Sequence, residues 1–106
     1  MREFKFQYKN KYHIGRDYTL IFYKLNNRGL YSIKIKDGNY ILDDDYTHLI
    51  LSNFLGFKDC NELYSHLKNN FQHEKTWLCR ICFPLSECDK VIEWMESIAV
   101  INKLTK

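Results

Sequence analysis

The sequence predicts an α+β fold in which helices pack on one face of a mostly antiparallel sheet. Apolar and polar residues alternate through much of residues 3–42, whereas helical spacing begins after the acidic run at 43–45. Two turn signals, at 26–29 and at 37–38, divide the first half into short strands. The predicted order is ββββααβα: a four-stranded meander, two helices, a fifth strand and a final helix.

Four strands are predicted in the first half of the chain. Residues 3–9 alternate between aromatic and polar side chains, which is typical of a strand with one buried face. Residues 10–17 are expected to form a polar loop. The stretch 18–25 is apolar on both faces and therefore predicts a central strand. Strands at 30–36 and 39–42 complete the meander.

The two hairpin turns predict how these strands pair. In the second hairpin, Ile35 is expected to face Tyr40. Ile41 then lies opposite Lys34, and the first hairpin places Ile21 opposite the same lysine. The apolar face of the sheet carries Phe4, Phe6, Tyr8, Leu20, Phe22, Tyr31, Ile33, Ile35, Tyr40 and Leu42. The opposite face, called the second face below, carries Lys5, Lys9, Thr19, Ile21, Tyr23, Ser32, Lys34, Lys36 and Ile41. Helices are expected to cover the apolar face and to leave the second face toward solvent or a partner.

The second half predicts two helices, a strand and a third helix. Residues 46–55 follow an acidic run and end at Gly56, a residue suited to closing a helix. The segment 59–62 has the spacing of a capping box and begins the second helix. Residues 76–83 return to strand character. The last helix runs from 86 to 103, and its expected buried face is Cys88, Val91, Ile92, Met95, Ile98 and Ala99.

Length and charge limit the classes of protein. The chain has 106 residues, and we expect a single domain over 1–106. Its net charge is +3, but residues 1–41 hold nine Lys/Arg and three acids, whereas residues 42–106 hold seven and ten. The basic half either binds an anionic partner or is neutralised by the acidic half within the fold. No stretch approaches the ~18 apolar residues of a membrane span, which excludes an integral membrane protein.

Four cysteines, Cys60, Cys79, Cys82 and Cys88, bear on compartment and on metal binding. Disulfide scaffolds usually carry more cysteines and a signal peptide, which the start of this chain lacks. We therefore expect reduced thiols and a cytoplasmic protein. Cys79 and Cys82 lie inside a predicted strand, where residues three apart point to opposite faces. Zinc ligands of this spacing need a tight turn instead, so the thiols are interpreted as small buried hydrophobes.

The segment 43–48 is the other cluster with metal-ligand chemistry, since it holds three aspartates and His48. Acidic residues before a helix also cap its unpaired N–H groups. Because no second ligand cluster accompanies this one, the aspartates are interpreted as helix caps rather than metal ligands. The four histidines are scattered, and the four glycines sit at turns or caps rather than in a phosphate-binding loop. We therefore expect no catalytic residue, no metal and no cofactor.

The second face supplies the candidate binding site. Tyr23, Ile21 and Ile41 are expected to form an apolar centre ringed by lysines, which is the arrangement of a modest protein interface. We therefore expect a small non-catalytic interaction module that docks a larger macromolecule. Its expected partner-binding residues are Ile21, Tyr23, Lys34, Lys36 and Ile41. Residues with AT-rich codons are abundant, which suggests a phage or mobile-element protein that inhibits or regulates a host defence nuclease.

Nucleic acid is the alternative partner. A basic sheet face that bears an aromatic ring can hold phosphates while a base stacks on the ring. The residues for this role are Lys5, Lys9, Tyr23, Lys34 and Lys36. One tyrosine is a small platform, however, and the aromatic segments of an RNA-recognition motif are missing, so a protein partner is placed first. The partner's identity, the oligomeric state and the pairing of residues 76–83 are left open.

Overall fold

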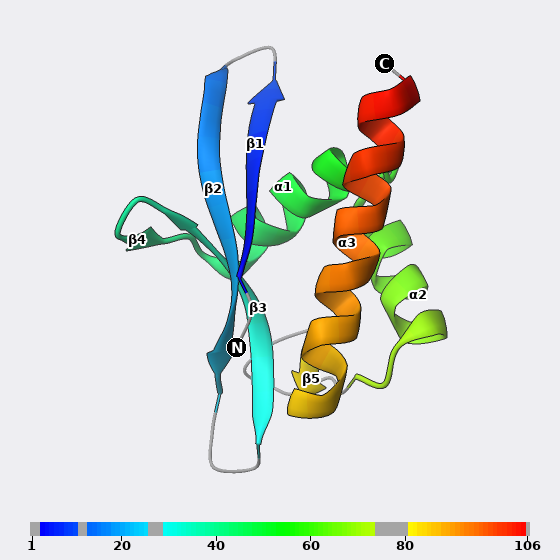
Figure 1. Ribbon diagram of the computed structural model, residues 1–106. Coiled ribbons are helices and arrows are strands. Elements are labelled where there is room, and N and C mark those ends of the chain that lie inside the picture. The colour runs from blue at the N-terminus through cyan, green and yellow to red at the C-terminus, as the bar shows by residue number, and fades with distance from the viewer. Residues whose placement is uncertain (1–2, 11–12, 26–28, 74–80, 106) are drawn as a thin grey trace.

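The computed structural model describes residues 3–10, 13–25, 29–73 and 81–105. Within these residues, five strands and three helices follow one another in the order ββββααβα, which confirms the α+β fold. All three helices lie on the same side of the sheet (Figure 1). The elements are β1 (Phe4–Asn10), β2 (His13–Lys24), β3 (Leu30–Asp37), β4 (Tyr40–Ile41), α1 (Asp44–Leu55), α2 (Cys60–Asn70), β5 (Cys82–Pro84) and α3 (Leu85–Thr105).

The described strands pair antiparallel, in the order β1-β2-β3-β4. The pairing of β2 with β3 follows the predicted register, since Ile21 lies opposite Lys34. β5 pairs with β3 as well, opposite residues 30–32, whereas β4 lies opposite residues 36–37. Both short strands therefore occupy the same edge of β3, which is the pairing that the sequence leaves open.

The pairing of β1 with β2 extends further along the chain than the sequence predicts. Residues 10–17 are expected to form a loop, but β2 already begins at His13, which lies opposite Asn10 of β1. The pairing becomes irregular only between Tyr8 and Asn10. For residues 13–17 the loop prediction is wrong, because the exposed Gly15, Arg16 and Asp17 resemble a loop in composition although they lie in a strand. Residues 11–12 of the predicted loop lie outside the described residues.

The second hairpin is tighter than the sequence predicts. Tyr40 lies opposite Asp37 instead of Ile35, and the N–H of Leu42 donates to the carbonyl oxygen of Ile35 at 2.9 Å. Gly38 allows this short turn because its φ is +64°, in the left-handed region. The shift is two residues, so every side chain keeps its predicted face. Tyr40, however, lies beyond the core and is 70% exposed, and Leu42 is buried in its place.

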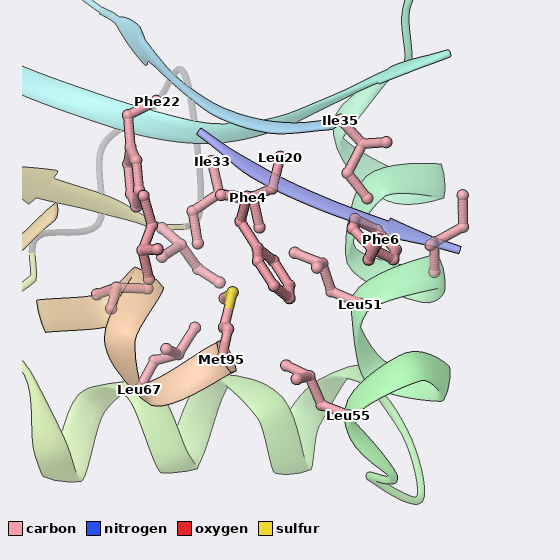
Figure 2. Close-up of a cluster of buried hydrophobic side chains, with 14 of the residues drawn as sticks. Phe4, Phe6, Leu20, Phe22, Ile33, Ile35, Leu51, Leu55, Leu67 and Met95 are labelled. Atoms are coloured by element: carbon pink, nitrogen blue, oxygen red, sulfur yellow. The ribbon is translucent and has the colours of Figure 1, made fainter. Parts of the chain in front are cut away.

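The core fills the space between the sheet and the helices (Figure 2). From the strands, Phe4, Phe6, Leu20, Phe22, Ile33 and Ile35 extend toward Leu51 and Leu55 of α1, Leu67 of α2 and Met95 of α3. The predicted buried face of the last helix is confirmed at Cys88, Val91, Ile92 and Met95. Ile98 packs against this core while partly exposed, and the side chain of Ala99 lies outside the described residues.

The predicted N-terminal caps of α1 and α2 are both present. Asp43 accepts a hydrogen bond from the N–H of Tyr46 at 2.7 Å, so α1 begins at Asp44, two residues before the predicted start. Asp59 caps α2 by accepting from the N–H of Glu62 at 2.9 Å. Of the strand predicted over 76–83, only the end from Cys82 lies in β5, and residues 76–80 lie outside the described residues.

Candidate functional site

The second face carries the predicted binding residues in rows that cross the sheet, each residue directly opposite the next. One row consists of Lys5, Thr19, Lys36 and Ile41. The next row holds Ile21 and Lys34, and the row beyond it holds Tyr23, Ser32 and Cys82. The side chain of Lys9 lies outside the described residues. The second face is therefore assembled from all five strands, as the alternation predicts.

The apolar centre of this face differs from the prediction. Tyr23 and Ile41 are exposed, and Ile21 is half-buried. Ile41 lies opposite Lys36 rather than Lys34, because the second hairpin is tighter than expected. β3 and its lysines separate Ile41 from the other two residues. The predicted continuous island is therefore two neighbouring apolar patches with a basic strip between them.

Lys34 is engaged within the fold. Its ammonium group donates to the carboxylate of Asp44, at the start of α1, and both side chains are partly shielded from solvent. This ion pair joins the basic first half of the chain to the acidic second half. Lys34 therefore offers a partner less positive charge than the sequence suggests. In the sequence, Asp44 stands out only as part of an acidic run, so this contact is not predicted.

We expect the contribution of this ion pair to stability to be small and dependent on salt. In a double-mutant cycle of Lys34→Ala and Asp44→Ala, measured by urea unfolding, the coupling free energy should be at most about 1 kcal/mol and should fall as salt is added. Asp45 is the matched control because it is the adjacent carboxylate and is exposed. Equal coupling of Lys34 with Asp45→Ala and with Asp44→Ala would contradict a specific pair.

Part of the second face is closed, contrary to the expectation that it faces solvent throughout. Leu30, Ser32 and Cys82 are buried on this side, at the end of the sheet where β5 pairs with β3. The open part therefore runs from Tyr23 to the row that contains Lys5 and Ile41. This limit is not predicted because the sequence leaves open where the fifth strand pairs.

Of the two thiols that are interpreted as small buried hydrophobes, Cys82 is buried as expected. Cys82 and Cys88 are buried, and Cys60 is half-buried. The Cys88 thiol lies 3.6 Å from the carbonyl oxygen of Pro84, to which it donates. Burial raises the pKa of the Cys88 thiol to about 11, and the negative charge of Asp89 adds to this shift. Cys79 lies outside the described residues.

The members of the acidic cluster at 43–48 have separate roles. Asp43 caps α1, and Asp44 pairs with Lys34. His48 is buried, with its Nδ1 atom 2.8 Å from the hydroxyl oxygen of Tyr64. Across the described ranges, no group of three or more His, Cys, Asp or Glu residues is arranged to hold a metal ion. The cluster thus contributes to a helix start, an ion pair and a packed interior.

Four exposed apolar side chains lie elsewhere among the described residues and are not predicted from the sequence: Tyr40, Tyr46, Leu49 and Leu85. Tyr40 is exposed because of the tight second hairpin. Tyr46 and Leu49 are three residues apart on α1 and share its outer face, whereas Thr47, Ile50 and Leu51 are buried. That spacing is the signal in the sequence that identifies an outward apolar pair.

Comparison of the chain with protein-family models, with curated proteins and with solved structures gives no match in any of the three. In the described part of the chain, no helix combines the length and the apolar character needed to cross a membrane. The function is therefore inferred from the geometry of the described residues.

Proposed function

We propose that this protein is a small, non-catalytic interaction module that binds a protein partner through the open part of its second face. One observation carries the proposal. The three described helices all pack on the opposite side of the sheet (Figure 1), yet Tyr23 is 52% exposed and Ile41 is 39% exposed on this side. Covering such side chains is favourable by roughly 25 cal/mol per Å² of apolar surface. Tyrosine is also a residue type enriched at protein interfaces.

The charges around these two residues support a partner with acidic side chains. Lys5 is exposed, and Lys36 is half-buried between Thr19 and Ile41. Opposite charges at the rim of an interface increase the association rate and fix the orientation of the partner. The partner that fits is a protein surface with an apolar contact point and carboxylates beside it. The proposal places the complex in the cytoplasm, where the thiols of the cysteines stay reduced.

Capture of a partner from a cell extract tests this proposal. Wild type, Tyr23→Ala and Tyr40→Ala are each immobilised and exposed to an extract of cells that carry the gene. Tyr40 is the matched control because it is an exposed tyrosine on the opposite side of the sheet. We expect wild type and Tyr40→Ala to retain the same protein and Tyr23→Ala to lose it. With that protein purified, Tyr23→Ala should weaken the affinity by at least about tenfold. Equal retention by all three proteins, or no retained protein, would overturn the proposal.

The nucleic-acid alternative has its own measurement. Lys34 is paired with Asp44, which leaves fewer cations for phosphates than the sequence suggests. We expect labelled single- and double-stranded DNA and RNA to show no change in fluorescence anisotropy at low salt. Binding that falls steeply with salt, and that Lys5→Ala and Lys36→Ala weaken, would replace the protein partner by a nucleic acid. The origin in a phage or mobile element stays a prediction from nucleotide bias.

A further inference from the structure

β1 is an edge strand with an unused row of main-chain groups. Among the described strands it pairs only with β2 (Figure 1). The N–H of Leu25 donates to the carbonyl oxygen of Leu30 at 2.8 Å, so the odd-numbered residues of β2 direct their main-chain groups toward β3. The even-numbered residues of β2 therefore bond to Phe4, Phe6 and Tyr8 of β1. It follows that the main-chain N–H and carbonyl groups of the intervening odd-numbered residues of β1 lie in the plane of the sheet and point outward from its edge.

The sequence of β1 is complementary to itself when it is read antiparallel about Phe6. With Phe6 opposite Phe6 of a second copy, Lys5 lies opposite Gln7. Phe4 lies opposite Tyr8. Aromatic residues thus meet aromatic residues on one face, and on the other face lysine meets neutral glutamine. Aromatic cross-strand pairs stabilise an antiparallel sheet.

Other registers of the same strand pair are unfavourable. A shift of one residue would place outward-pointing main-chain groups opposite inward-pointing ones, so the hydrogen bonds would not form. A shift of two residues in one direction places Lys5 opposite Lys5, and in the other direction it places Lys5 opposite Lys9. Like charges directly opposite each other are destabilising. Lysine on an edge strand normally discourages pairing, but in the register centred on Phe6 it faces glutamine.

We propose that the protein forms a two-fold symmetric dimer in which β1 pairs antiparallel with β1 of a second copy, with Phe6 at the two-fold axis. The N–H and carbonyl groups of Lys5 and Gln7 supply the new hydrogen bonds. The aromatic side of the contact is already ordered, because the Phe6 ring lies 5.6 Å from the ring of Phe4 and 4.6 Å from that of Phe54. One strand pair is a small interface, so the dimer dissociates on dilution. The dimer contact shares Lys5 with the proposed partner surface but uses the main-chain groups of that residue, so it does not rest on the proposed function.

Sedimentation and amide hydrogen exchange test the dimer over a range of protein concentrations. We expect the mean mass to rise from that of one chain to that of two. The amides of Lys5 and Gln7 should become protected as the dimer forms, whereas the amide of Phe6, which bonds to β2, is protected at every concentration. A constant monomer mass, or a dimer without protection of Lys5 and Gln7, would overturn the proposal.

Two variants of Gln7 locate the contact. Gln7→Pro removes an outward N–H without breaking a bond to β2, and should raise the dissociation constant by about tenfold or more. Gln7→Ala keeps that N–H and should still dimerise, and thermal unfolding checks that both variants fold. A dimer that tolerates Gln7→Pro would show that β1 is not the interface.

Discussion

Replacing Phe83 by alanine is expected to lower the free energy of unfolding by about 3–5 kcal/mol. Phe83 is fully buried, and it joins the three-residue strand β5 to the rest of the core. Its ring makes edge contacts with Phe22 of β2, at a centroid distance of 6.1 Å, and with Phe71 at the end of α2, at 6.4 Å. A domain of this size is typically stable by only about 5–15 kcal/mol, so the loss is a large part of the total. Urea unfolding followed by circular dichroism measures it.

Leu85 provides the control for this substitution. It lies two residues further along the chain and is 57% exposed, so Leu85→Ala should change the free energy of unfolding by no more than about 0.5 kcal/mol. Similar losses for Phe83→Ala and Leu85→Ala would contradict the placement of the core. Phe83→Ala should also raise the exchange rates of the amides in β5 and in the part of β3 paired with it, because the ring holds the two strands against the helices.

Alternation and turn chemistry predict most of this fold because both act locally. The buried and exposed positions of β1 to β3 follow from the period of two, and Gly56 ends α1 with a φ of +85°, as expected of a closing residue. The exact pairing in the second hairpin depends on whether two or four residues form the turn. The sequence around Gly38 permits both turns. Both leave every side chain on the same face of the sheet, so the alternation of apolar and polar residues does not distinguish them.

The candidate site is predicted less completely, because its properties depend on contacts between distant residues. Alternation assigns Tyr23 and Lys34 to one face correctly. Whether Lys34 is available depends on Asp44, and that depends on where α1 begins relative to β3. Burial of Ser32 and Cys82 depends on the pairing of β5, which is separated from β3 by two helices in the sequence. Local patterns carry no information about either contact.

Raising the pH is expected to destabilise the protein through the Cys88 thiol. Burial raises the pKa of this thiol from its ordinary value of 9.0 to about 11 in the folded protein. Between these two values the unfolded chain releases the proton and the folded chain keeps it, so the stabilising contribution is complete below about pH 9 and is lost as the pH rises through about 11. The shift corresponds to a loss of roughly 2–3 kcal/mol.

Urea unfolding at a series of alkaline pH values measures this effect in wild type, Cys88→Ala and Cys60→Ala. Cys88→Ala should be less stable at neutral pH because it leaves a small cavity, but its stability should fall less steeply above about pH 9. Cys60 is only half-buried, so Cys60→Ala should keep the pH dependence of wild type. Burial also raises the pKa of Tyr18, but that contribution is present in all three proteins and cancels from the comparison. Parallel pH profiles for wild type and Cys88→Ala would contradict this prediction. They would mean that the Cys88 thiol titrates alike in the folded and unfolded chains, although it is buried against Pro84 in the folded one.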